Sequence, residues 1–115
     1  MNTKITKKNI CISLFPKQVT FHELEIGNTQ LLCVSNGMIY RRMKSTYWKQ
    51  VENRRNHNKG YNVILIEKKQ YTRAKIMLMS QGKINIDMKN MNIYHKNGDR
   101  LDCAFTNLCL NVPTI

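Results

Sequence analysis

The dipeptide Asn36-Gly37 constrains the fold of this chain most strongly, because it is typical of a tight hairpin turn. Both positions tolerate positive φ angles, which the two-residue turns of β-hairpins require. Residues 31–34 before the turn and residues 38–40 after it are rich in residues that favour strands. An alternating run at residues 21–26 leads into an earlier turn at Gly27-Asn28. The sequence therefore predicts three consecutive strands in a small antiparallel sheet.

The second half of the chain repeats the strand-and-turn pattern and adds a helix. Residues 61–66 form another β-type run that turns back within a few residues, so we expect a second hairpin. From residue 73 to residue 81 the composition favours a short helix, which Gly82 ends. Residues 83–89 then alternate between apolar and polar, which predicts a half-buried or irregular strand.

These elements predict one α+β domain, a small antiparallel sheet with one or two short helices. A length of 115 residues suits one hydrophobic core and is too short for two independent ones. Residues 10–15 carry a weaker β pattern that Pro16 closes. We therefore assign residues 1–20 to an N-terminal arm or strand and residues 21–115 to the domain.

Charge indicates the class of partner. Nineteen Lys and Arg residues stand against seven Asp and Glu residues, a formal net charge of +12. This excess exceeds what solubility requires and indicates a polyanion, with nucleic acid, either DNA or RNA, as the first candidate. No apolar run approaches the roughly 20 residues of a spanning helix, and the apolar patch at residues 10–15 is too brief for a signal peptide. We expect no membrane partner and an intracellular location: cytoplasmic, nucleoid-associated or in a virion.

The basic residues are densest between Arg41 and Gly60, where Glu52 is the single acid. Charge runs are often solvated loops or short helices, but the charge of the whole chain favours a phosphate-contacting surface. Tyr47 and Trp48 within this segment either stack on bases or pack on the sheet, and we expect Trp48 to pack. The predicted nucleic-acid-binding residues are Arg41, Arg42, Lys44, Lys49, Arg54, Arg55, Lys59, Lys68, Lys69, Arg73 and Lys75.

The four cysteines, Cys11, Cys33, Cys103 and Cys109, form no Cys-x-x-Cys pair. Their spacing fits none of the usual zinc ribbons, so buried, reduced thiols are the simplest expectation. A zinc site made by Cys103, Cys109 and His95 is the alternative.

Polar and glycine residues recur at a fixed spacing near the C-terminus: His95, Gly98, Asp99, Asp102 and the pair Asn107-Leu108. This pattern resembles the metal finger of phage and intron-encoded HNH homing endonucleases. Residues 33–40 and residues 58–61 are similar to two upstream motifs of that family: the short strand before the nuclease and the start of its central hairpin. All three motifs keep the family's order, and the resemblance covers most of the chain.

The resemblance implies that His95 occupies the position of the general base. Hydrolysis of a phosphodiester needs a base to activate water and a divalent cation to neutralise charge. In the family, a side chain beside the base and another from a following helix hold Mg²⁺ or a similar ion. The resemblance gives Asn107 the structural role of tying down the loop, together with Gly98 and Asp102. Asp99 and Asp102 are expected to bond to the backbone of their turn rather than to a metal.

Three departures from the family pattern indicate that the nuclease has been lost. Tyr94 stands where Asp, Asn or His is usual, and a neutral phenol is a poor ligand for a hard cation. Ala74 stands where the family tends to place a His, and Pro113 leaves no room for the terminal helix that carries a ligand. We expect His95 to be a vestigial base, with no metal site and no cofactor. Mg²⁺ would bind only if nuclease activity survives.

The sequence therefore predicts a nucleic-acid-binding protein that resembles an HNH homing endonuclease and does not cut. One alternative is a small basic component of a ribonucleoprotein or viral assembly, which would prefer structured RNA or a protein partner. Another is an active HNH nickase in which a second chain supplies the missing ligand. Richness in Lys, Asn and Ile fits an AT-rich genome, such as that of a phage, virus or mobile element.

Overall fold

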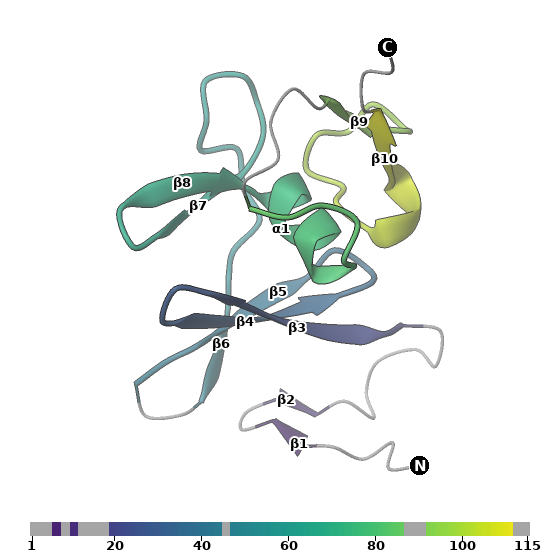
Figure 1. The fold of residues 1–115 in the computed structure, drawn as a ribbon. Helices are drawn as coiled ribbons and strands as arrows, with labels where there is room; N and C mark the ends of the chain where they lie inside the picture. The colour runs from purple at the N-terminus through teal and green to yellow at the C-terminus, as the bar shows by residue number, and fades with distance from the viewer. Residues whose placement is uncertain (1–5, 8–9, 12–18, 45–46, 87–91, 112–115) are drawn as a thin grey trace.

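The computed structural model describes residues 6–7, 10–11, 19–44, 47–86 and 92–111. Within these residues the chain has an α+β fold of small antiparallel sheets and one α-helix (Figure 1). Near the N-terminus, strands β1 (Thr6–Lys7) and β2 (Ile10–Cys11) pair with each other. The rest of the predicted strand at residues 10–15 lies outside the described residues.

The largest sheet has four antiparallel strands in sequence order: β3 (Phe21–Ile26), β4 (Thr29–Val34), β5 (Ile39–Arg42) and β6 (Trp48–Gln50). The three strands predicted from the sequence are confirmed. The turns between them contain Gly27 and Gly37, with φ of 57° and 104°, values that favour glycine.

Strand β6 was not among the strands predicted from the sequence, where the basic segment was weighed as a solvated loop or short helix against a phosphate-contacting surface. Its pairing with β5 places Trp48 opposite Arg42. Trp48 is buried and packs with Leu32, Val34 and Tyr40. The burial of one aromatic ring therefore holds this short strand on the sheet, although its other two residues are polar and exposed.

The predicted second hairpin and helix are confirmed as β7 (Val63–Ile66), β8 (Lys69–Thr72) and α1 (Arg73–Ser80). Glu67 and Lys68 form the turn, with φ of 51° and 72°. The hairpin is attached to the large sheet at two points. The Asn28 N–H donates to the Glu67 carboxylate at 2.6 Å, and the Arg41 guanidinium donates to the Leu65 carbonyl at 3.1 Å.

The third hairpin pairs β9 (Asn92–His95) with β10 (Leu108–Asn111), and the 3₁₀ turn η2 (Phe105–Asn107) precedes β10. Among the described residues 83–86, the strand predicted for residues 83–89 is absent, and that prediction was wrong there. The Lys83 N–H instead donates to the Leu78 carbonyl, so the chain follows the end of α1. Residues 87–91 lie outside the described residues.

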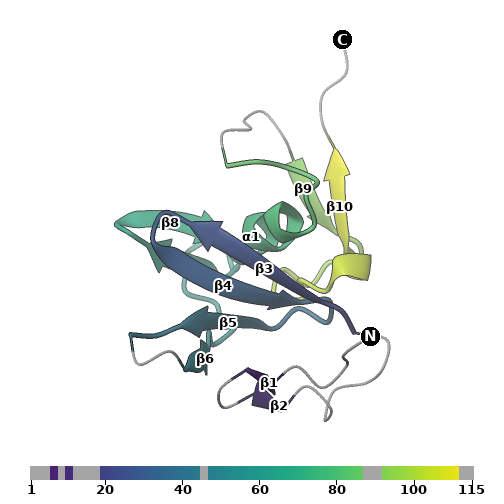
Figure 2. The same ribbon diagram turned by 60° about the horizontal axis from the view of Figure 1, so that its bottom comes forward.

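Two hydrophobic clusters cover the two faces of β4. Alternate residues of a strand point to opposite faces, and Leu31 and Cys33 belong to one cluster while Leu32 and Val34 belong to the other. The first cluster is the main core and includes the buried face of α1, together with Ile64, Ile66, Cys103 and Leu108. Helix α1 therefore lies between the large sheet and the two hairpins β7–β8 and β9–β10 (Figures 1 and 2).

Candidate nucleic-acid interface

A pocket of about 660 Å³ opens where α1 begins, beside the C-terminal hairpin. This volume lies within the roughly 300–1,000 Å³ of typical ligand sites. Its walls come from three parts of the chain: Lys59, Tyr61, Asn62, Thr72, Ala74, Lys75, Asn92, Ile93, Tyr94, His95, Gly98 and Arg100. All four residues of β9 line it, so the pocket runs along the edge of β9 that does not pair with β10.

The lining carries positive charge. Lys59, Lys75 and Arg100 contribute three cations, and no Asp or Glu is among the lining residues. The N-terminal end of α1 adds to this potential, since the helix dipole is positive there. The Thr72 side chain caps the helix by accepting from the Lys75 N–H at 3.2 Å. The pocket is therefore suited to an anion.

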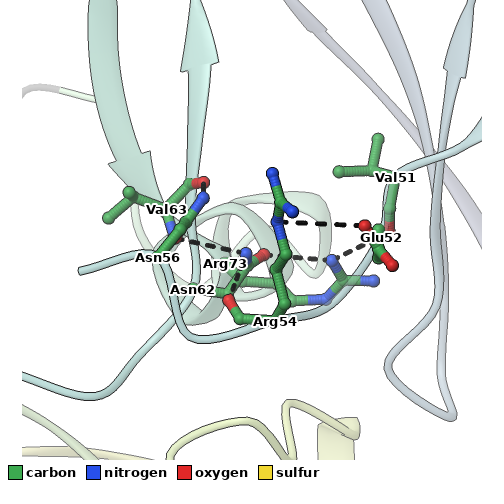
Figure 3. Close-up of polar contacts among 7 residues, drawn as sticks. All are labelled: Val51, Glu52, Arg54, Asn56, Asn62, Val63 and Arg73. Atoms are coloured by element: carbon green, nitrogen blue, oxygen red, sulfur yellow. Dashed lines mark hydrogen bonds and ion pairs between the residues drawn. The ribbon is translucent and has the colours of Figure 1, made fainter.

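A network of polar side chains, with Asn62 and Arg73 buried at its centre, positions the irregular segment that carries Lys59 (Figure 3). Asn62 is buried, and its amide N–H₂ donates to the Arg54 carbonyl at 2.8 Å. Asn56 bonds to both backbone groups of Val63, accepting from the N–H at 2.7 Å and donating to the carbonyl at 2.9 Å. The segment therefore has a fixed path without regular secondary structure.

Arg73 lies at the centre of this network and is only 2% exposed. Its guanidinium donates to the Gly37 carbonyl at 3.1 Å, the Val51 carbonyl at 3.1 Å and the Asn62 side-chain oxygen at 3.2 Å. Burial lowers the pKa of Arg73, and no carboxylate is among these partners. The prediction that Arg73 contacts phosphate needs correction, because a buried guanidinium with these bonds cannot reach a polyanion.

Two hydrogen bonds connect the segment around Lys59 to the loop between β9 and β10. The Arg100 guanidinium donates to the Lys59 carbonyl, and the Asn53 amide donates to the Leu101 carbonyl at 2.6 Å. These bonds bring Lys59 and Arg100 to the same rim of the pocket although they are distant in sequence.

Asn107 organises the loop between β9 and β10. Its side-chain oxygen accepts from the Asn97 N–H at 3.0 Å, and its amide donates to the Asp102 carbonyl at 2.7 Å. Its own carbonyl accepts from the Lys96 N–H at 2.8 Å. Gly98, with φ of 79°, provides the left-handed residue of the same loop. The side-chain amide of Asn107 therefore ties the start of the loop to its middle.

The two acids of this loop bond within it. The Asp99 carboxylate accepts from the Leu101 N–H at 3.0 Å. The Asp102 carboxylate accepts from the Ala104 N–H at 3.3 Å and from the Asn97 amide at 2.7 Å. Neither acid lines the pocket.

His95 ends β9, and its Nε2 lies 3.9 Å from the Cys103 sulfur. Burial lowers the pKa of His95, and the nearby Arg100 lowers it further, while Asp102 and Asp99 act in the opposite direction. The imidazole is therefore neutral at physiological pH.

Among the described cysteines, Cys103 alone is in hydrogen-bonding contact with His95, and the two are not part of a larger group of metal-binding side chains. Cys33 and Cys103 are buried, which raises the pKa of each thiol to about 11 and keeps both protonated. Cys109 is exposed and lies opposite Tyr94 in the hairpin, one position along from the Leu108–His95 pair. In the part of the chain that the structure describes, no three His, Cys, Asp or Glu side chains are grouped to hold a metal. The Cys11 side chain lies outside that part.

Of the basic residues predicted from the sequence, Lys59 and Lys75 line the pocket. Arg41 and Arg42 lie on β5, where the Arg42 guanidinium bonds to the Gln30 side chain at 2.8 Å. Arg54 is exposed, 3.8 Å from the Glu52 carboxylate. The others are exposed outside the pocket: Lys44, Lys49, Arg55, Lys68 and Lys69.

Sequence reasoning missed the roles of Arg100 and of two aromatic residues in this site. Tyr61 and the half-exposed Tyr94 both line the pocket. Arg100 follows Gly98 and Asp99 inside the C-terminal pattern, and no role was predicted for it. The sequence signal that could have indicated its role is its position two residues after the turn glycine Gly98.

Neither a family model, nor a curated protein, nor a solved structure matches this chain. Within the described residues, no helix is long and apolar enough to cross a membrane.

Proposed function

We propose that this protein binds nucleic acid at the pocket beside β9, and that its C-terminal hairpin is a degenerate HNH-like finger that no longer cleaves. One observation carries the proposal: His95 and Tyr94 lie in a pocket with Lys59, Lys75 and Arg100, and no carboxylate lines it. Three cations at one concave site suit the phosphates of a polyanion.

The side chains around His95 support loss of cleavage. A hard divalent cation prefers carboxylate oxygen ligands. The neighbouring position is Tyr94, Ala74 is among the lining residues, and Asp99 and Asp102 bond to the loop. A neutral His95 retains the form that accepts a proton, but a base without a cation-binding oxygen set lacks half of the required chemistry.

The arrangement of the loop supports the resemblance to the HNH finger. In that family, an Asn next to Leu ties down the loop that follows the catalytic His. Here Asn107 binds the Asn97 N–H and the Asp102 carbonyl, and Leu108 pairs with His95 in the hairpin. The positions of His95 and Ala74 in the pocket, and the bonds of Asn107 to the loop after His95, support this part of the proposal.

A plasmid assay tests the two halves of the proposal together. With Mg²⁺ or Mn²⁺ present, we expect supercoiled plasmid to stay intact while its mobility is retarded by bound protein. Nicking that disappears in His95→Ala would contradict the loss of cleavage and support an active nickase. Intact plasmid without retardation, combined with no affinity for RNA or single strands, would contradict nucleic-acid binding.

A further inference from the structure

We infer that the pocket receives one unpaired nucleotide, so that the protein binds single-stranded nucleic acid more tightly than duplex. This inference rests on the proposed function and names the form of nucleic acid that the site selects. It follows from the combination of a concave shape, aromatic rings, cations and a free strand edge at one place.

The shape of the site favours a nucleotide outside a double helix. A volume of about 660 Å³ accommodates a ligand of nucleotide size. In a duplex, the bases are stacked and paired, and extruding one costs a few kcal/mol. A nucleotide in a single strand enters the pocket without this free-energy cost. A concave site therefore favours single-stranded nucleic acid over duplex.

Two tyrosines supply surfaces on which a base can stack. Tyr94 lines the pocket with 49% of its surface exposed. Tyr61 lines it too, and its ring is held by stacking on His57, with 4.5 Å between centroids and an interplanar angle of 11°. Stacking on an aromatic side chain contributes about 1–3 kcal/mol per base and tolerates any base. A simple phosphate or an acidic peptide would not need these rings.

The edge of β9 supplies hydrogen-bonding groups that suit the open edge of an unpaired base. Within the described residues, β9 pairs with β10 on one side, and its other edge faces the pocket. Such an edge presents backbone N–H and C=O groups. In a duplex, the pairing edge of each base is occupied, whereas in a single strand it is open to protein hydrogen bonds.

The cations lie where the adjoining phosphates of such a nucleotide can be neutralised. Lys59 and Arg100 share one rim through the hydrogen bond between the Arg100 guanidinium and the Lys59 carbonyl. Lys75 lies in the first turn of α1, where the helix dipole also favours negative charge. The same chemistry accepts DNA or RNA, because none of these contacts involves the sugar.

Fluorescence anisotropy with three labelled probes tests the inference. The probes are a single-stranded oligodeoxythymidine of about twelve nucleotides, its DNA duplex with oligodeoxyadenosine, and the matching single-stranded oligouridine RNA. We expect the protein to bind both single strands at least about tenfold more tightly than the duplex, since extruding a base costs a few kcal/mol. Comparing the thymidine and uridine probes separates DNA from RNA. Equal or tighter binding of the duplex would overturn the inference and leave nucleic-acid binding intact. No binding of any probe would overturn the proposed function as well.

Variants at the stacking surface give a second readout. Tyr94→Leu removes the aromatic ring from an exposed position and should weaken single-strand binding by about 5- to 150-fold, with duplex binding changed less than about twofold. Tyr94→Phe keeps the ring and should bind like the native protein. Tyr47→Leu is the matched control, since Tyr47 is exposed but does not line the pocket. A Tyr94→Leu effect no larger than that of Tyr47→Leu would contradict stacking at this site. If Tyr94→Leu fails to fold, the comparison of probes on the native protein still decides.

Discussion

Asn107 shows how one side chain can stabilise a loop that lacks regular structure. It is 8% exposed, and its amide bonds with the Asn97 N–H, the Asn97 side-chain oxygen and the Asp102 carbonyl. Sequence reasoning gave it a structural role only through a family resemblance. The spacing of residues could not identify its partners, because they depend on the path of the loop.

Removing this amide should destabilise the fold. Asn107→Ala leaves backbone groups of the loop without partners, and each orphaned buried polar group costs about 1–3 kcal/mol. We expect a loss of that size in the free energy of unfolding, measured by urea denaturation. Asn58→Ala, at an exposed position, is the control and should change stability by less than about 0.5 kcal/mol. An unchanged midpoint for Asn107→Ala would show that the loop does not depend on this side chain.

His95 should make stability depend on pH. Its pKa is lowered in the folded state by burial and by Arg100, so the unfolded chain binds the proton more readily. The stabilisation is complete above the unfolded pKa, near 6.5, and is lost as the pH falls through the folded pKa. Urea midpoints measured between about pH 7 and pH 5 should decline in the native protein and decline less in His95→Gln. Parallel curves for the two proteins would contradict the assignment.

At the scale of elements, alternation and turn residues predicted β3, β4, β5, the hairpin β7–β8 and α1, because these elements are determined by local patterns. The failures have tertiary causes. Strand β6 depends on the burial of Trp48 against the sheet, which a count of charges does not reveal. At residues 83–86, alternation was misleading, since Ile84 is buried beside the end of α1 while Ile86 is 39% exposed.

The same limit applies to the candidate site. Three of the residues predicted from the sequence, His95, Lys59 and Lys75, line the pocket, but the sequence could not separate a buried arginine from an exposed one. Arg73 was grouped with the surface cations, although it is fully enclosed and joins three segments of the chain. The amino-acid sequence shows which side chains are charged, but the fold determines which of them are exposed to solvent.

The segments joined by Arg73 should separate when its guanidinium is removed. Arg73→Met keeps an apolar stem but leaves the Gly37 and Val51 carbonyls unpaired, so we expect a loss of at least about 2 kcal/mol. Urea denaturation provides the measurement, and Arg55→Met, at an exposed position, is the matched control. Equal stability of the two variants would contradict the central role of Arg73 in packing.

At the scale of the whole molecule, a net charge of +12 attracts any polyanion, but it does not say where the polyanion binds. A diffuse positive surface and a concentrated site predict different responses to the same loss of charge. Charges farther apart than about 8 Å are largely screened at physiological salt. Cations gathered around one pocket should therefore act on a bound phosphate more strongly than scattered ones.

The most direct test compares two triple variants that lose equal charge. The pocket variant removes the cations of the pocket and carries Lys59→Gln, Lys75→Gln and Arg100→Gln. The other variant removes exposed cations from β6 and from the β7–β8 hairpin and carries Lys49→Gln, Lys68→Gln and Lys69→Gln. Binding is measured by anisotropy over a range of salt concentrations, with far-UV circular dichroism to check that both variants fold. For the pocket variant we expect weaker binding, with the dependence of log affinity on log salt falling by about 0.7–0.9 per lost phosphate contact. The other variant should keep most of its affinity and slope. Equal losses in the two variants would contradict a binding site at the pocket and indicate a diffuse positive surface instead.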